Sequence, residues 1–93
     1  MKKRKLPPYT GSTQAERAKN IPSADWQAAM KLRAARMAKG ASFSLRDLAV
    51  YVFFGTDAEA FDRARVILEL MISSELVEKV DGWRAQGIRK GGY

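Results

Sequence analysis

Apolar residues recur at helical spacing in the segment between Pro22 and Gly40. Ser23 is a suitable N-cap for a helix, and the glycine is a suitable C-terminal stop. The spacing predicts a first helix over residues 24–39. Its apolar stripe, with steps of four, four and three residues, comprises Trp26, Met30, Ala34 and Met37.

A capping box predicts where the second helix begins. Ser44 provides the cap, and Asp47, three residues later, can bond back to the backbone of the cap residue. The following run, residues 48–54, is apolar on all sides, so by propensity it also fits a buried strand. The capping box, together with Gly55, favours a helix.

A second capping box, residues 56–59 with Thr56 as the cap, predicts the start of the third and longest helix. This helix is expected to run to about Ser74. Its apolar stripe is wide enough to face a core. The stripe comprises Phe61, Ala64, Ile67, Leu68, Met71 and Ile72.

The dipeptide Asp81-Gly82, between residues 76–80 and residues 83–86, is a strong short signal for a β-hairpin. Trp83 beside the turn is expected to close the hairpin onto the first helix, although an indole there can also stack on a sugar or a base. The predicted fold is mainly α with a small β-hairpin, namely three helices and then two strands over residues 23–88.

The segments outside residues 23–88 have the composition of disordered chain. Residues 1–22 contain two adjacent prolines, six basic residues and few large apolar groups, so we expect a basic disordered arm. A short helix over residues 13–19, especially on a bound partner, is the alternative. Residues 89–93 are expected to form a frayed tail.

The composition excludes several classes of function. The chain has no cysteine and no histidine, so it cannot form a Cys/His zinc site or a Ser/His or Cys/His catalytic pair. Its carboxylates are scattered among basic residues. We therefore expect no enzyme activity, no catalytic residue, no small-molecule substrate, no cofactor and no metal.

The sequence also predicts where the protein works. No apolar stretch approaches the roughly 18 residues that a membrane span needs. The basic start leads into Leu6-Pro7 rather than an apolar segment, so it is unlike a signal peptide. We expect a cytoplasmic, nucleoid-associated protein. The basic run over residues 2–5 also resembles a nuclear localisation signal, but such runs are common and this interpretation is disfavoured.

Positive charge is concentrated in the first half of the chain. Residues 1–40 carry ten Lys/Arg and two acidic residues, a charge of +8, whereas residues 41–93 carry seven and eight, a charge of −1. With a pI near 10.1, this balance indicates a polyanionic partner. Nucleic acid is favoured over an anionic membrane surface.

Two passages of the sequence resemble the winged helix-turn-helix family. Residues 44–49, Ser-Leu-Arg-Asp-Leu-Ala, are similar to the S-x-x-D/E-L-A opening of the second helix in its regulators. Residues 68–71 and 75–83 are similar to the passage from the third helix into the wing. Two features differ from the family pattern: Glu75 stands at a usual glycine, and the segment 48–76 is several residues longer.

The resemblance implies binding of double-stranded DNA, with the third helix in the major groove. However, the helix face opposite the predicted core stripe suits a groove poorly, because carboxylates repel phosphate and apolar side chains gain little there. This face comprises Glu59, Asp62, Arg63, Val66, Leu70 and Ser73.

Apolar residues on the predicted outer surfaces indicate association with protein. We expect Val66 and Leu70, together with Val50 and Phe54, to form the interface of a homodimer or of a complex with another protein. In the alternative, an extra helical turn carries some of them into the core, or Tyr9 and Ile21 of the arm cover them.

Phosphate contacts are expected chiefly from the arm and the first helix, with limited sequence selection by Arg46, Arg63, the wing or DNA shape. The leading hypothesis is a small DNA-binding protein, a transcription regulator or nucleoprotein accessory factor of phage or plasmid type. The alternative is an interaction adaptor whose third-helix face binds a protein. The predicted nucleic-acid-binding residues are Lys2, Lys3, Arg4, Lys5, Arg17, Lys19, Lys31, Arg33, Arg36, Lys39, Arg46, Arg63, Lys79 and Arg84.

Overall fold

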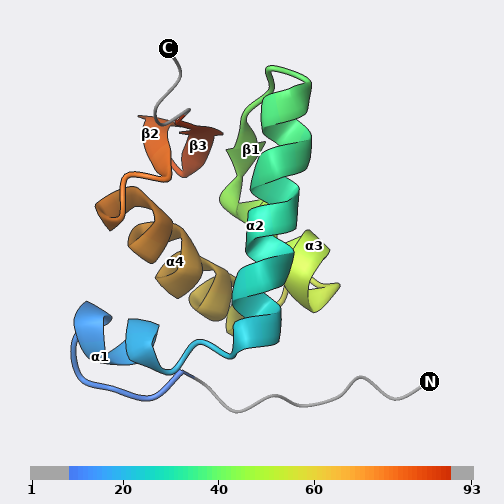
Figure 1. The fold of residues 1–93 in the computed structure, drawn as a ribbon. Coiled ribbons are helices and arrows are strands. Elements are labelled where there is room, and N and C mark those ends of the chain that lie inside the picture. Colours follow the sequence, from blue (N-terminus) through green and yellow to red (C-terminus); the bar gives the residue numbers. More distant parts are fainter. Residues whose placement is uncertain (1–8, 89–93) are drawn as a thin grey trace.

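The computed structural model describes residues 9–88, which form a mainly helical fold with a small three-stranded antiparallel sheet (Figure 1). The three predicted helices and the hairpin are present, so this coarse architecture is confirmed. A short strand, β1, and a short N-terminal helix, α1, add to it. In chain order the elements are α1 (Gln14–Lys19), α2 (Ser23–Ala38), β1 (Phe43–Ser44), α3 (Leu45–Phe53), α4 (Ala58–Ser73), β2 (Val77–Asp81) and β3 (Arg84–Gly87).

Side-chain caps determine where α3 and α4 begin. The capping box of α3 is confirmed: the Ser44 hydroxyl accepts a hydrogen bond from the Asp47 N–H at 3.1 Å, and the Asp47 carboxylate accepts one from the Ser44 N–H at 3.0 Å. The strand alternative for this segment is therefore wrong. The predicted cap of α4, Thr56, is wrong by one residue, because the Asp57 carboxylate accepts the bond from the Ala60 N–H at 2.9 Å.

The central strand of the sheet is β3, which lies between β1 and β2. Asp81 pairs with Arg84 across the hairpin, so the turn consists of Gly82 and Trp83, one residue later than the sequence predicts. Gly82 adopts a φ of +51°, which a residue without a side chain tolerates well. The strand β1 pairs with the other edge of β3. It has only two residues, too few for an alternation of apolar and polar residues that would have predicted it from the sequence.

The core lies between α2, α3, α4 and the sheet. On α2 the buried residues are Ala29 and Leu32, and Trp26, Met30 and Met37 of the predicted stripe are half-buried, whereas Ala34 is exposed. The end of β3 lies close to α2: a Cβ at Gly87 would overlap the side chain of Met37. The largest fully buried side chains are Phe43, Leu48, Val66, Ile67, Leu68, Met71 and Val77.

Residues 9–22 differ from the predicted disordered arm, because they pack on the helical core. The Tyr9 side chain is buried, its ring centroid lies 6.4 Å from that of Phe53, and its hydroxyl donates a hydrogen bond to Asp25 at 2.6 Å. The Gln14 side chain donates one to the carbonyl of Val66 at 3.0 Å, which holds α1 against α4 (Figure 1). Tyr9, Gln14 and the partly buried Ile21 therefore anchor a segment of otherwise polar composition. The predictions for residues 1–8 and 89–93 lie outside the described residues.

The burial of Tyr9 predicts a loss of stability in alkali. Desolvation, followed by the hydrogen bond to Asp25, raises the pKa of the Tyr9 phenol far above its ordinary 10.0. The neutral phenol is thus favoured in the folded state, and its stabilisation is complete below about pH 10 and declines as the unfolded chain ionises above that pH. We expect urea unfolding, followed between about pH 8 and pH 11, to show a weaker pH dependence in Tyr9→Phe. Tyr51→Phe, at an exposed tyrosine, is the control, and equal pH dependences in Tyr9→Phe and the native chain would contradict the prediction.

Candidate functional site

The part of the chain that the structure describes is almost neutral. Residues 9–88 carry eleven Lys/Arg and ten Asp/Glu, which leaves a net charge of +1 of the total +7. The remaining cations lie in residues 2–5 and 89–90. The predicted phosphate contacts of Lys2, Lys3, Arg4 and Lys5 therefore fall outside the described residues.

The outer face of α4 is not the surface that the sequence predicts. Arg63 and Val66 are only 4% and 2% exposed, because the Tyr9–α1 segment packs over this side of the helix. Leu70 is half-buried. The predictions of Arg63 as a DNA contact and of Val66 as an interface residue are therefore wrong for this fold. For Val66 the alternative prediction holds, namely that the N-terminal segment covers its side chain.

The residues of α4 that stay exposed bear mostly negative charge. Glu59 and Asp62 are exposed near its N-terminal end. Glu59 lies 3.8 Å from the Arg63 guanidinium, and Asp62 lies 3.8 Å from that of Arg65. Since each carboxylate faces an arginine of its own helix, α4 presents little free positive charge to a phosphate.

Arg33 is held within the fold rather than presented to a ligand. Its Nε donates a hydrogen bond to the Leu76 carbonyl and its Nη2 donates one to the Ile88 carbonyl, each at 2.7 Å. The guanidinium thereby ties α2 to the start of β2 and the end of β3. This arrangement favours a structural role for Arg33 over the predicted phosphate contact, because two of its donors are already engaged by carbonyls.

Three arginines gather around the first turn of α3, and we call Arg36, Arg46 and Arg84 the α3 patch. Arg36 donates a hydrogen bond to the Ser42 carbonyl at 3.3 Å, and Arg84 donates one to the Ser42 hydroxyl at 3.2 Å. Arg46 is exposed one residue after the helix begins. The structure therefore brings together two predicted DNA contacts, Arg36 of α2 and Arg84 of the hairpin, at Ser42, and a third, Arg46, lies on the first turn of the helix that follows.

One carboxylate partly balances the α3 patch. The pKa of Asp47 is lowered chiefly by the hydrogen bond from the Ser44 backbone N–H, and also by the charges of Arg36 and Arg84. Its nearest guanidinium atom, on Arg36, is 4.0 Å away. Arg36 and Arg84 act on this one carboxylate and Arg46 is exposed next to it in the chain, so the α3 patch has more positive than negative charge.

The hairpin tip presents an aromatic side chain beside a cation. The Lys79 ammonium lies 4.5 Å from the centre of the Trp83 ring, a cation–π contact. Trp83 is 39% exposed, so the prediction that it closes the hairpin onto the first helix is wrong. It occupies the turn itself, between Asp81 and Arg84.

The remaining predicted cations are spread over other surfaces. Arg17 donates a hydrogen bond to the Gly11 carbonyl at 3.1 Å, and Lys19 is exposed at the end of α1. Lys31 and Lys39 are exposed on α2 and at its C-cap, two turns apart. The structure does not join these four residues into one site.

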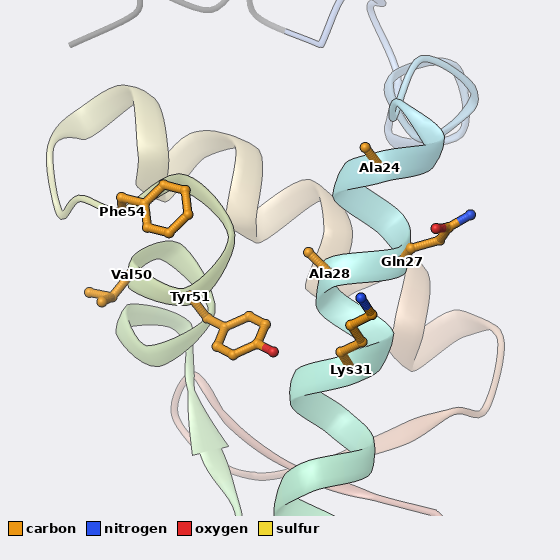
Figure 2. A pocket seen from close by; sticks show the side chains of 7 residues that line it. All are labelled: Ala24, Gln27, Ala28, Lys31, Val50, Tyr51 and Phe54. Atoms are coloured by element: carbon orange, nitrogen blue, oxygen red, sulfur yellow. The ribbon is translucent and has the colours of Figure 1, made fainter. Parts of the chain in front are cut away.

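An open groove of about 680 Å³ lies between α2 and α3 (Figure 2). On the α3 side, Val50, Tyr51 and Phe54 are 45%, 43% and 87% exposed. The predicted interface residues Val50 and Phe54 therefore share this surface, but Val66 and Leu70 do not. The α2 side comprises Ala24, Gln27, Ala28 and Lys31. Sequence reasoning missed the first three and predicted Lys31 as a nucleic-acid contact rather than as part of this groove.

The comparisons with known proteins add no relative to this description. No protein-family model, no curated protein and no solved structure matches the chain. Among residues 9–88, no helix is both long enough and apolar enough to cross a membrane. The surfaces that remain as candidate binding sites are the α3 patch, the hairpin and the groove.

Proposed function

We propose that the chain is a winged-helix domain that binds double-stranded DNA. The order α2–β1–α3–α4–β2–β3 and the sheet order β1-β3-β2 support this fold. The end of α4 gives further support. Glu75, at the position where the family usually has glycine, adopts a left-handed φ of +60°, a conformation that glycine adopts most readily.

The observation that carries DNA binding is the α3 patch together with the hairpin tip. Guanidinium groups form strong, directed hydrogen bonds with phosphate oxygens, and the N-terminus of a helix favours an anion. Lys79 and Trp83 extend the same kind of chemistry along the wing, because an ammonium attracts phosphate and an indole stacks on a sugar or a base. These groups suit the DNA backbone better than the acidic surface of α4 does.

The proposed mechanism gives affinity more than sequence selection. Neutralised phosphates supply a salt-dependent binding energy that is the same for every sequence. The basic residues of the two termini would add to it. A DNA-binding accessory factor or regulator, of phage or plasmid type and associated with the nucleoid, fits this balance best.

Charge reversal in the α3 patch tests the proposal. We expect Arg46→Glu combined with Arg84→Glu to weaken binding of a random DNA duplex more than tenfold. The slope of log K against log salt should fall by about 0.9 for each phosphate that the variant no longer neutralises. Fluorescence anisotropy between about 50 and 200 mM salt measures both quantities.

Two further variants show whether a loss of affinity in the double variant is specific to the α3 patch. Arg65→Glu, on the exposed part of α4, is the matched control and should change affinity much less. A variant lacking residues 1–8 separates the terminal contribution from that of the folded part. If the native chain fails to bind duplex at low salt, or if Arg65→Glu weakens binding as much as the double variant, the proposed interface is wrong.

A second candidate function is that of an interaction adaptor, favoured by the exposure of Phe54. Arg63 and Val66 of the predicted adaptor surface on α4 are covered by the chain itself, so this function is proposed for the groove between α2 and α3. It is compatible with DNA binding, because the groove residues and the α3 patch share no side chain.

A further inference from the structure

Phe54 combines two properties that do not help this chain to fold. Its φ of +59° is left-handed, at the C-cap of α3, where the N–H bonds back to the Val50 carbonyl at 3.0 Å. Glycine is the usual residue in this conformation, since a Cβ makes it unfavourable. In addition, the side chain is 87% exposed. A strained and exposed aromatic residue indicates a role outside folding.

The surroundings of Phe54 have the shape of a helix-binding groove. Val50 and Tyr51 continue the apolar wall along α3, and Figure 2 shows the Tyr51 ring directed from α3 toward α2. Across from them, Ala24 and Ala28 present small side chains, so another backbone can approach α2 closely. An amphipathic helix inserts apolar side chains at i, i+3, i+4 and i+7 into grooves of this kind.

The charge of the groove favours a partner that carries carboxylates over a second copy of this chain. Among the described residues that line it, Lys31 is the one charged side chain, and none is a carboxylate. A second copy docked on this face would bring a second Lys31 without an anion to balance it, and each chain has a net charge of +7. A partner with carboxylates beside its apolar residues would instead pair with Lys31.

We propose that the groove between α2 and α3 binds an amphipathic helix of another protein, with apolar side chains around Phe54 and a carboxylate facing Lys31. This inference rests on the adaptor function, for which it names the partner class. It is independent of DNA binding, which uses other residues.

Two stapled, fluorescein-labelled helical peptides test the inference. Both carry leucines at i, i+3, i+4 and i+7; one has glutamates beside this stripe and the other has lysines. We expect the native chain to bind the glutamate peptide at least tenfold more tightly. Phe54→Ala should weaken that binding about tenfold or more, as truncation of an aromatic anchor does. Lys31→Glu should reverse the preference between the two peptides.

Two control variants test whether weaker peptide binding by Phe54→Ala could result from loss of folding. Phe54→Gly relieves the left-handed strain, so its thermal midpoint should rise by about 4 °C while peptide binding is lost. Val80→Ala, at a side chain that is 52% exposed on β2 and does not line the groove, should bind as the native chain does.

Three results would each overturn the inference. The first is no saturable binding of the glutamate peptide to the native chain, and the second is binding that Phe54→Ala leaves unchanged. The third is a doubled mass in sedimentation that Phe54→Ala abolishes, which would make a second copy the occupant. DNA affinity measured on Phe54→Ala should stay unchanged, so failure of DNA binding and failure of peptide binding are separate outcomes.

Discussion

Phe43→Ala is expected to remove most of the free energy of unfolding of this protein at 25 °C. Phe43 is completely buried, and it is the larger of the two residues in β1, where it pairs with Ala85 of the central strand. Truncation of a buried phenylalanine removes about 3–5 kcal/mol of the free energy of unfolding. A small domain typically has only about 5 kcal/mol or somewhat more. Urea unfolding, monitored by circular dichroism at 222 nm and by tryptophan fluorescence, measures the loss.

The matched control for Phe43→Ala is Phe54→Ala, the same chemical change at an exposed side chain. Its effect on the free energy of unfolding should be below about 1 kcal/mol, since surface substitutions seldom change stability more than that. Similar losses in the two variants would contradict the assignment of Phe43 to the core and of Phe54 to the surface.

Arg33→Met is expected to have the second largest effect on stability, a loss of about 3 kcal/mol. A hydrogen bond to a charged group contributes roughly 1.5–3 kcal/mol, and Arg33 makes two of them, to the carbonyls of Leu76 and Ile88. Methionine keeps much of the apolar stem but leaves both carbonyls without this donor. The free energy of unfolding of Arg33→Lys should lie between those of the native chain and of Arg33→Met, because one ammonium group cannot match the planar guanidinium geometry.

Arg65→Met provides the control for the Arg33 variants. Arg65 faces Asp62 on the solvent side of α4, where an exposed ion pair contributes about 0–1 kcal/mol. If Arg33→Met retained native stability but lost affinity for DNA, the arginine would contact phosphate, as the sequence alone predicts. The stability measurement and the binding measurement therefore decide between the two roles.

Local signals in the sequence predicted most of the helical architecture. The hydrogen bonds of the α3 capping box join residues three positions apart, so the pair Ser44 and Asp47 is visible without any tertiary information. The hairpin likewise depends on a glycine that tolerates positive φ at Gly82. The error of one residue at the α4 cap arose because Thr56 and Asp57 are both suitable caps. The error at the hairpin turn arose because the strand register shifts between Lys79 and Asp81, which the sequence pattern does not reveal.

The functional surfaces were less predictable, because they depend on contacts between distant residues. Gln14 bonds to Val66 across 52 positions, and this contact helps to cover a face that helical periodicity alone assigns to solvent. Arg33 bonds to Ile88 across 55 positions, which removes it from the set of available cations. No local pattern distinguishes these side chains from exposed ones.

By itself, the sequence determined a charge of +7, three main helices with a C-terminal hairpin, and the pair Val50 and Phe54 as surface apolar residues. Only the tertiary structure decided that Arg63 and Val66 on the outer face of α4 are covered, that Arg36 and Arg84 meet at Ser42 before α3, and that Phe54 borders a groove with α2. The physical reason is that caps, turns and periodicity act within a few residues. Burial and charge clustering depend instead on which distant segments the folded core brings together.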